Sequence, residues 1–200
     1  MNAIEPIDSR LSLLILQHPR EKKETLATAA LTVSMVRRAS LVIGLSWANL
    51  SEALGRGADP RHWAVLYLGS ARPHAFGLGC PVIAVDRRGE AEPNQEAALR
   101  QLEGAVLLDG SWREAKALWW RNPWLLKLQR VVLDPPGPSH YTRVRREPRR
   151  EALSTIEAAA LLLTQLEGHP EIAATLTAAL DRMIAESRPR GFPARPRVNA

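Results

Sequence analysis

The stretch GAVLLDGSWREAKALWW, Gly104 to Trp120, joins a continuous apolar run to a helical pattern through Asp109, Gly110 and Ser111. An unbroken apolar run of this kind is typical of a strand that is buried on both faces. Glycine allows the chain to turn tightly directly after the strand. A buried strand that leads at once into a helix is a building unit of α/β proteins, so this stretch predicts that fold class.

Five further apolar runs are bounded by turn residues, and helical patterns separate several of them. Apolar positions keep one helical face from Leu26 to Arg38, and again from Ile172 to Ile184. This alternation predicts a mainly parallel sheet covered by helices. The other expected strands are Leu11 to Gln17, Ser40 to Trp47, Trp63 to Gly69, Pro81 to Asp86 and Arg130 to Asp134.

Length and composition favour one folded unit. The chain has 200 residues, for which we expect a single domain at 1–187 and a flexible, basic, proline-rich tail at 188–200. No run approaches the roughly 20 apolar residues of a membrane span, and the N-terminal MNAIEPIDSR has no secretory pattern. The single cysteine, Cys80, cannot form an internal disulfide. These features predict a cytoplasmic protein without membrane contact.

The net charge of +6 arises largely from arginine clusters, of which YTRVRREPRR is the densest. The planar guanidinium group pairs bidentately with phosphate, so this segment is a candidate contact for nucleic acid. A solvated, charge-rich loop is the alternative. The arginines concerned are Arg143, Arg145, Arg146, Arg149 and Arg150.

Polar residues gather where the predicted strands end. In open parallel sheets, ligands bind in the loops at the carboxyl ends of the strands. Four such loops carry polar or small residues: QHPRE after the first strand, LGSARP after the third, DGSW after the fifth and DPPGPSHY after the sixth. We therefore expect the binding site at this edge of the sheet.

Two helix starts carry the spacing of a capping box, Ser111 with Glu114 and Ser154 with Glu157. Capping explains both pairs without any ligand. A helix N-terminus also presents amide donors and a positive dipole end to an anion, so capping and binding are compatible. The two helix starts could together frame one anionic ligand.

The residues of the DGSW loop have both structural and chemical interpretations. Asp109 either accepts hydrogen bonds from loop amides or takes part directly in chemistry. Trp112, in the first helical turn, is placed to contact a ligand and could pack on a purine or a cation. For Trp119 and Trp120 the expectation is packing in the core.

Three ordered motifs resemble the DTW domain family of tRNA-uridine aminocarboxypropyltransferases. They are HPREKK at His18 to Lys23, DGSWREAK at Asp109 to Lys116, and YTRVRREPRREALSTIEAAAL at Tyr141 to Leu161. The resemblance runs from about Leu11 to about Leu166 and implies a SPOUT-like fold with a deep trefoil knot that holds S-adenosylmethionine. This chain has no N-terminal cysteine cluster of the kind that many relatives carry, so we expect no metal.

The resemblance implies transfer of the 3-amino-3-carboxypropyl group from S-adenosylmethionine to N3 of a tRNA uridine, with release of methylthioadenosine. Asp109 is the first candidate for the general base and Glu157 the second. Trp112 is expected to hold the methyl group of the cofactor away from the uridine. The expected cofactor-binding residues are Leu68, Gly69, Ser70, Asp109, Gly110, Ser111, Trp112, Ser154 and Thr155.

Contacts with tRNA are expected from three parts of the chain: His18, Tyr141 and the arginines from Arg143 to Arg150. Tyr141 would stack on a base, and the arginines would bind phosphates. A monomer without an obligate protein partner is expected. Three rival functions remain: the same transfer to ribosomal RNA, RNA methylation by a SPOUT-type enzyme, and RNA binding without catalysis.

Overall fold

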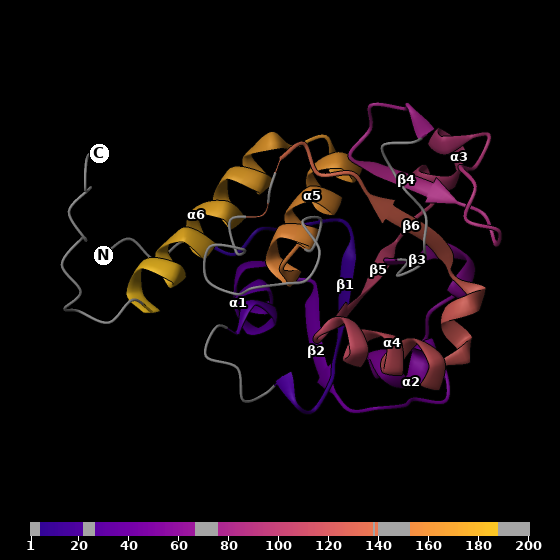
Figure 1. Ribbon diagram of the computed structural model, residues 1–200, viewed down its shortest axis with the longest axis horizontal. Coiled ribbons are helices and arrows are strands. Elements are labelled where there is room, and N and C mark those ends of the chain that lie inside the picture. Colours follow the sequence, from indigo (N-terminus) through magenta and orange to yellow (C-terminus); the bar gives the residue numbers. More distant parts are fainter. Residues whose placement is uncertain (1–4, 22–26, 67–75, 138, 140–152, 188–200) are drawn as a thin grey trace, which may run out of the picture.

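The computed structural model describes residues 5–21, 27–66, 76–137, 139 and 153–187, which build one sheet with helices on both faces (Figure 1). The sheet has six strands in the order β2-β1-β5-β3-β6-β4. All neighbouring strands are parallel except β4 and β6, which are antiparallel. The predicted α/β fold with a mainly parallel sheet is confirmed. The strands are β1 (Ser12–Gln17), β2 (Ala39–Ile43), β3 (Trp63–Leu66), β4 (Val82–Val85), β5 (Gly104–Asp109) and β6 (Gln129–Leu133).

Two helical layers enclose the sheet. One face packs against α1 (Thr28–Met35), α5 (Thr155–Glu167) and α6 (Pro170–Ser187). The other packs against α2 (Leu50–Leu54), α4 (Trp112–Arg121) and the 3₁₀ helix η4 (Pro123–Lys127). At the β4 edge lies α3 (Gln95–Arg100), and the 3₁₀ helix η2 (Pro60–His62) leads into β3.

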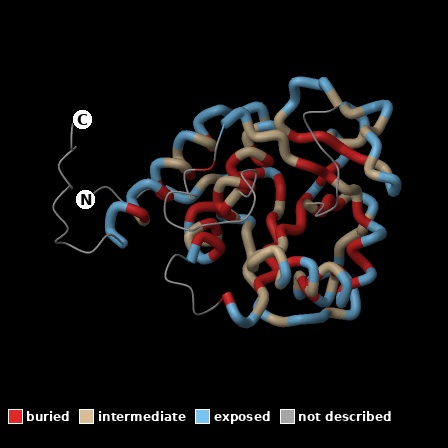
Figure 2. The backbone as a smooth tube through the Cα atoms, in the orientation of Figure 1, coloured by how far each residue is buried: buried red, intermediate tan, exposed pale blue. Residues whose placement is uncertain are grey.

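The central strands are apolar at successive positions because both of their faces are covered. In β1, Leu13 and Ile15 belong to the core on the α5 side, whereas Leu14 and Leu16 belong to the core on the α4 side. All four side chains are fully buried, and each such burial stabilises the fold by about 2 kcal/mol. Figure 2 shows the buried trace concentrated in the sheet and in the inner faces of the helices.

Strand β2 ends at Ile43, before the predicted end at Trp47. The chain leaves the sheet there to contact the end of α4. The backbone N–H of Trp47 donates to Oδ1 of Asn122 at 2.9 Å, and the hydroxyl of Ser46 donates to the carbonyl of Arg121 at 3.0 Å. An apolar run can therefore continue past its strand when its last side chains pack on a helix.

Both predicted helical patterns are helices, although the first is shorter than expected. The helix predicted from Leu26 to Arg38 is α1, which ends at Met35 because Val36 has an extended backbone. The final helix is confirmed as α6, whose buried positions repeat at helical spacing. They are Ile172, Leu176, Ala179, Leu180 and Ile184. The tail at 188–200 lies outside the described residues, and the domain boundaries stay a prediction.

The prediction that Trp120 packs in the core is wrong, because this side chain is 79% exposed. Ala115 and Leu118 set the inner face of α4. Trp120 follows Leu118 by two residues, which turns it about 200° away around the helix axis. Trp119 is half-buried and does pack against the core on that side.

No helix in the described ranges is both long enough and apolar enough to cross a membrane.

Candidate functional site

The candidate site lies where β1 and β5 end side by side. The register of these parallel strands pairs Gln17 with Asp109. The side-chain amide of Gln17 donates to Oδ2 of Asp109 at 2.8 Å. The hydroxyl of Thr155, the first residue of α5, donates to Oδ1 of the same carboxylate. A strand on one side and a helix start on the other therefore orient the half-buried Asp109 carboxylate.

The turn after β5 leaves no room for a side chain. Gly110 has φ +156°, and a Cβ added there would lie 2.9 Å from Cβ of Glu114 and 3.4 Å from Cβ of His18. The backbone N–H of His18 also donates to the carbonyl of Asp109 at 2.9 Å, which continues the strand pairing into this turn. Glycine is required because the loop after β1 and the first turn of α4 meet over this position.

The first predicted capping box is present at the start of α4. Oε2 of Glu114 accepts from the backbone N–H of Ser111 at 2.9 Å and from its hydroxyl at 2.7 Å. Nδ1 of His18 lies 3.7 Å from Oε1 of Glu114. Burial by itself would raise the pKa of Glu114, but the hydrogen bonds from Ser111 and the charges of His18 and Arg20 bring it below its ordinary value. Glu114 is therefore a carboxylate at neutral pH.

The second capping box is present at the start of α5 and includes a further residue. Oε2 of Glu157 accepts from the backbone N–H of Ser154 at 2.9 Å and from its hydroxyl at 2.6 Å. The hydroxyl of Ser139, from the segment after β6, donates to the same oxygen at 2.7 Å. Ser139 and Ser154 are both buried. Glu157 thus ties the loop after β6 to α5.

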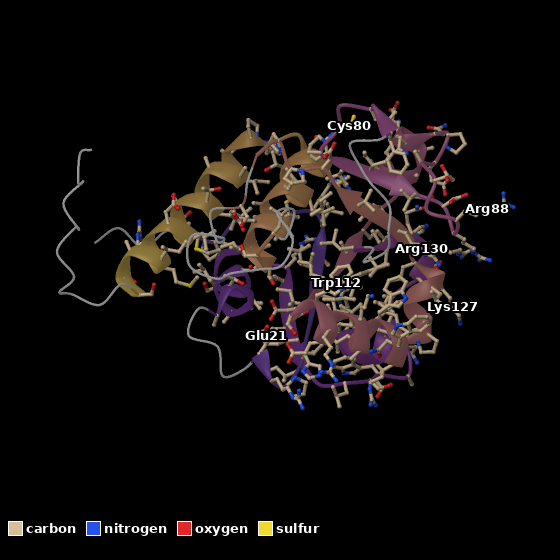
Figure 3. All side chains as sticks on the ribbon, viewed as in Figure 1. Glu21, Cys80, Arg88, Trp112, Lys127 and Arg130 are labelled. Carbon is tan, nitrogen blue, oxygen red and sulfur yellow. The ribbon has the colours of Figure 1, made fainter. Side chains whose placement is uncertain are left out.

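Trp112 is the first residue of α4 and is half-buried beside the motif loop. The ammonium group of Lys116 lies 5.3 Å from the centroid of its ring, which is a cation–π geometry. The sequence indicated that Trp112 could pack on a cation, and in the structure Lys116 occupies that role. Figure 3 labels Trp112 among the side chains of this region.

The structure brings together four of the expected segments: the ends of β1 and β5 and the starts of α4 and α5. His18 was expected to contact RNA, and it lies inside this cluster against Gly110 and Glu114.

Sequence reasoning did not assign a role in the site to Gln17 or Ser139, which contact Asp109 and Glu157. Gln17 could have been found from the sequence, because it is a polar residue at the end of an otherwise apolar strand. The expected site residues outside the described part are Leu68, Gly69, Ser70, Tyr141, Arg143, Arg145, Arg146, Arg149 and Arg150.

Within the described ranges, no group of three or more histidine, cysteine, aspartate or glutamate side chains is arranged to hold a metal ion. The expectation that the protein needs no metal stays a prediction.

Comparison with known proteins identifies the family. The DTW domain model matches residues 1–188. The chain is 33% identical over 172 residues to tRNA-uridine aminocarboxypropyltransferase 2 of Drosophila melanogaster, covering 84% of this chain and 61% of that protein. It is 25% identical over 185 residues to the mouse protein of the same name, covering 90% of this chain and 56% of that protein.

The protein of that name from Macaca fascicularis is also 25% identical, with 89% of this chain and 55% of that protein covered. The chain thus spans less than two thirds of the length of these relatives. No solved structure matches it significantly. The match of the DTW model along almost the whole chain is decisive, and the chain belongs to the DTW domain family.

Proposed function

We propose that this chain transfers the 3-amino-3-carboxypropyl group of S-adenosylmethionine to N3 of a uridine in tRNA. The observation that carries the proposal is the Asp109 carboxylate, oriented by Gln17 and Thr155 between the starts of two capped helices. Membership of the DTW family and the names of its relatives support the reaction class. The donor would supply an electrophilic carbon beside its sulfonium.

Asp109 is the proposed general base. Uridine N3 must lose its proton to become a nucleophile, and a positioned carboxylate within hydrogen-bond reach can accept that proton. The hydrogen bonds from Gln17 and Thr155 restrict the carboxylate to one orientation, which is the kind of preorganisation that proximity catalysis needs. Glu157 is the second candidate, and its Oε2 has a structural role because it caps α5 through Ser154 and also accepts from Ser139.

The residues around Asp109 fit the proposed donor. The N-termini of α4 and α5 place two positive dipole ends near the motif loop, where they favour a carboxylate such as that of an amino acid. Trp112 offers an aromatic wall at the same place. In this proposal the cofactor contacts are the residues expected from the sequence: Leu68, Gly69, Ser70, Asp109, Gly110, Ser111, Trp112, Ser154 and Thr155.

The remaining expectations from the sequence and from the family resemblance are part of the same proposal. They are a SPOUT-like knot, RNA contacts from His18, Tyr141 and the arginines between Arg143 and Arg150, and a cytoplasmic monomer that uses no metal.

Mass spectrometry of nucleosides tests the proposal. The purified chain is incubated with total tRNA and S-adenosylmethionine, and the tRNA is then digested to nucleosides. We expect a uridine that carries one added aminocarboxypropyl group, together with methylthioadenosine in equal amount. A methylated nucleoside with S-adenosylhomocysteine would instead make the chain a methyltransferase. If only ribosomal RNA is modified, the substrate is ribosomal RNA and not tRNA. If the chain binds RNA but forms neither product, it is an RNA-binding module without catalytic activity.

A further inference from the structure

One face of α4 carries aromatic and cationic side chains only. Trp112, Arg113, Lys116, Trp119 and Trp120 form the α4 stripe, which covers an arc of about 120° around the helix axis. The buried positions Ala115 and Leu118 lie on a different arc. The stripe therefore lies away from these two buried positions, with Trp119 at its edge packed against the core and Trp120 exposed.

The stripe is unusually accessible for its composition. Tryptophan is among the most buried residues on average, yet Trp120 is 79% exposed. Arg113 and Lys116 are exposed as well, while Trp112 and Trp119 are half-buried. An indole ring held in solvent between cations is an available stacking surface.

Two tryptophan rings of the stripe lie next to a cation, one from α4 itself and one from β6. Lys116 lies over Trp112 at 5.3 Å, and the guanidinium carbon of Arg130 lies 5.9 Å from the ring centroid of Trp119. Arg130 is the second residue of β6, and its Nη1 donates to the backbone carbonyl of Arg87 at 2.7 Å. The stripe is thereby joined to the β4 and β6 side of the molecule.

Beyond Arg130 lies a basic pocket of about 570 Å³, lined by the start of β6, the end of β4, and residues of η2 and η4. Its lining includes the cations Arg61, Arg87, Lys127 and Arg130.

One of the two carboxylates that line this pocket, Asp86, accepts hydrogen bonds from backbone amides. Asp86 accepts from the backbone N–H groups of Arg88 and Glu90 at 2.7 and 3.0 Å. These amides, Glu90 first, lower the pKa of Asp86, although desolvation opposes them. Glu92 is the other carboxylate of the lining. Arg61 forms an ion pair with Asp59 at 2.7 Å, but the other cations of the lining, Arg87, Lys127 and Arg130, still outnumber its two carboxylates, which suits an anionic ligand.

The stripe leads from the candidate site to this pocket. Helix α4 starts directly after the Asp109 loop and runs back along the sheet, so Trp112 and Trp120 lie about 12 Å apart along the axis. Because β6 is parallel to β5, its first residues lie at the opposite edge of the sheet from Asp109. Figure 3 shows Trp112 near the middle of the view and Arg130 and Lys127 toward its right side.

We propose that the α4 stripe and the basic pocket together bind the RNA strand that continues from the modified uridine. A base would stack on the exposed ring of Trp120, and phosphates would pair with Arg113, Lys116 and Lys127. Single-stranded RNA is recognised by such a combination of aromatic platforms and cations along the backbone. The cations of the stripe and of the pocket favour a polyanion over an ordinary protein partner. The inference rests on the proposed function only in taking RNA as the substrate.

Binding of total tRNA to the full chain tests the stacking surface. Trp120→Ala should weaken binding about 5- to 100-fold, the usual effect of removing one aromatic platform, and Trp120→Phe should retain most of the affinity. Because Trp120 is so exposed, neither change should alter the melting temperature. Equal binding by the wild type, Trp120→Ala and Trp120→Phe would overturn the proposal.

Salt dependence tests the phosphate contacts. The double change Arg113→Ala with Lys127→Ala should reduce the slope of log affinity against log salt by about 0.7 for each lost contact. The matched control is Arg37→Ala with Arg182→Ala, which removes the same charge from exposed positions outside the stripe and pocket. Equal slopes in the two double variants would contradict phosphate binding at the α4 stripe and the basic pocket.

The same proteins separate this inference from the proposed function. If the wild type modifies uridine but the stripe variants bind tRNA like the controls, the inference fails and the function stands. If the wild type transfers nothing but tRNA binding still depends on Trp120, the inference stands and the function fails. A wild-type dimer that Trp120→Ala dissociates, with unchanged tRNA binding, would make the stripe a protein interface and would also overturn the inference.

Discussion

The hydroxyl of Thr155 donates a hydrogen bond to Asp109, which lies 46 residues earlier in the chain. Thr155 opens α5, and Asp109 ends β5 on the neighbouring layer. This bond ties two of the three motifs that define the family resemblance into one site. It also makes the orientation of the proposed base depend on how α5 docks against the sheet.

Replacement of Asp109 by asparagine should leave the fold intact and S-adenosylmethionine binding within about tenfold of the wild type. The transfer rate should fall by at least about a hundredfold, because an amide cannot accept the N3 proton. Single-turnover kinetics and calorimetry measure the two quantities. Undiminished turnover would remove Asp109 from the chemistry, and a parallel loss of binding and rate would indicate that it only shapes the loop.

Replacement of Thr155 by valine keeps the shape of the side chain but removes the donor to Asp109. We expect a loss of about 1 to 2 kcal/mol in the free energy of unfolding and a slower transfer. Thr155→Ser restores the hydroxyl and should recover the rate. Urea titration and the transfer assay follow both effects, and a valine variant as fast as the serine variant would show that this hydrogen bond does not position the base.

Replacement of Gly110 by alanine should destabilise the protein by about 1 to 3 kcal/mol, because the new methyl would meet Glu114 in a backbone conformation that alanine rarely adopts. Gly55 is the matched control, since it also has positive φ, at +68°, but has nothing within 4 Å of an added Cβ. In thermal melts, the Gly110→Ala variant should have a lower melting temperature than the Gly55→Ala variant. The reverse order of melting temperatures would mean that the loop after β5 can shift to accommodate the added methyl group.

Acid should weaken the capping box at Ser111. The folded state holds the pKa of Glu114 below its ordinary value of 4.5, so the unfolded chain binds a proton first as the pH falls. The stabilisation is present above about pH 5 and is lost as the pH falls through the lower, folded-state value. Glu114→Gln should therefore be less stable at neutral pH and show a shallower loss of stability on acidification. Denaturant unfolding at several pH values compares the two proteins, and curves of equal slope would contradict this assignment.

Replacement of Trp112 by alanine should weaken S-adenosylmethionine binding more than it lowers the melting temperature of the ligand-free protein. The side chain is half-buried at the mouth of the motif loop, so it adds less to the core than to the proposed pocket. Calorimetry measures the affinity for S-adenosylmethionine, and thermal melts measure the melting temperature. A large loss of stability with normal affinity would assign Trp112 to packing alone.

Local pattern was sufficient to predict the elements that carry this site. Unbroken apolar runs mark strands covered on both faces, and serine with glutamate three residues later marks the starts of α4 and α5, where both capping boxes are present. Asp109 and Gly110 could be placed at a strand end because the change from apolar run to helical pattern occurs at that point. These features depend on neighbours in the chain.

Tertiary structure alone decided which of these residues meet. The contact between Gln17 and Asp109 follows from the register of β1 and β5, and Ser139 reaches Glu157 only because α5 docks beside the end of β6. The antiparallel direction of β4 could not be read from its sequence, since a buried strand has the same apolar pattern in either direction. Trp120 looked like a core residue but is exposed, because the face of α4 that packs inward is chosen by the fit of Ala115 and Leu118 against the sheet. Each of these outcomes depends on pairing between segments far apart in the chain, and hydrophobicity along the sequence does not encode that pairing.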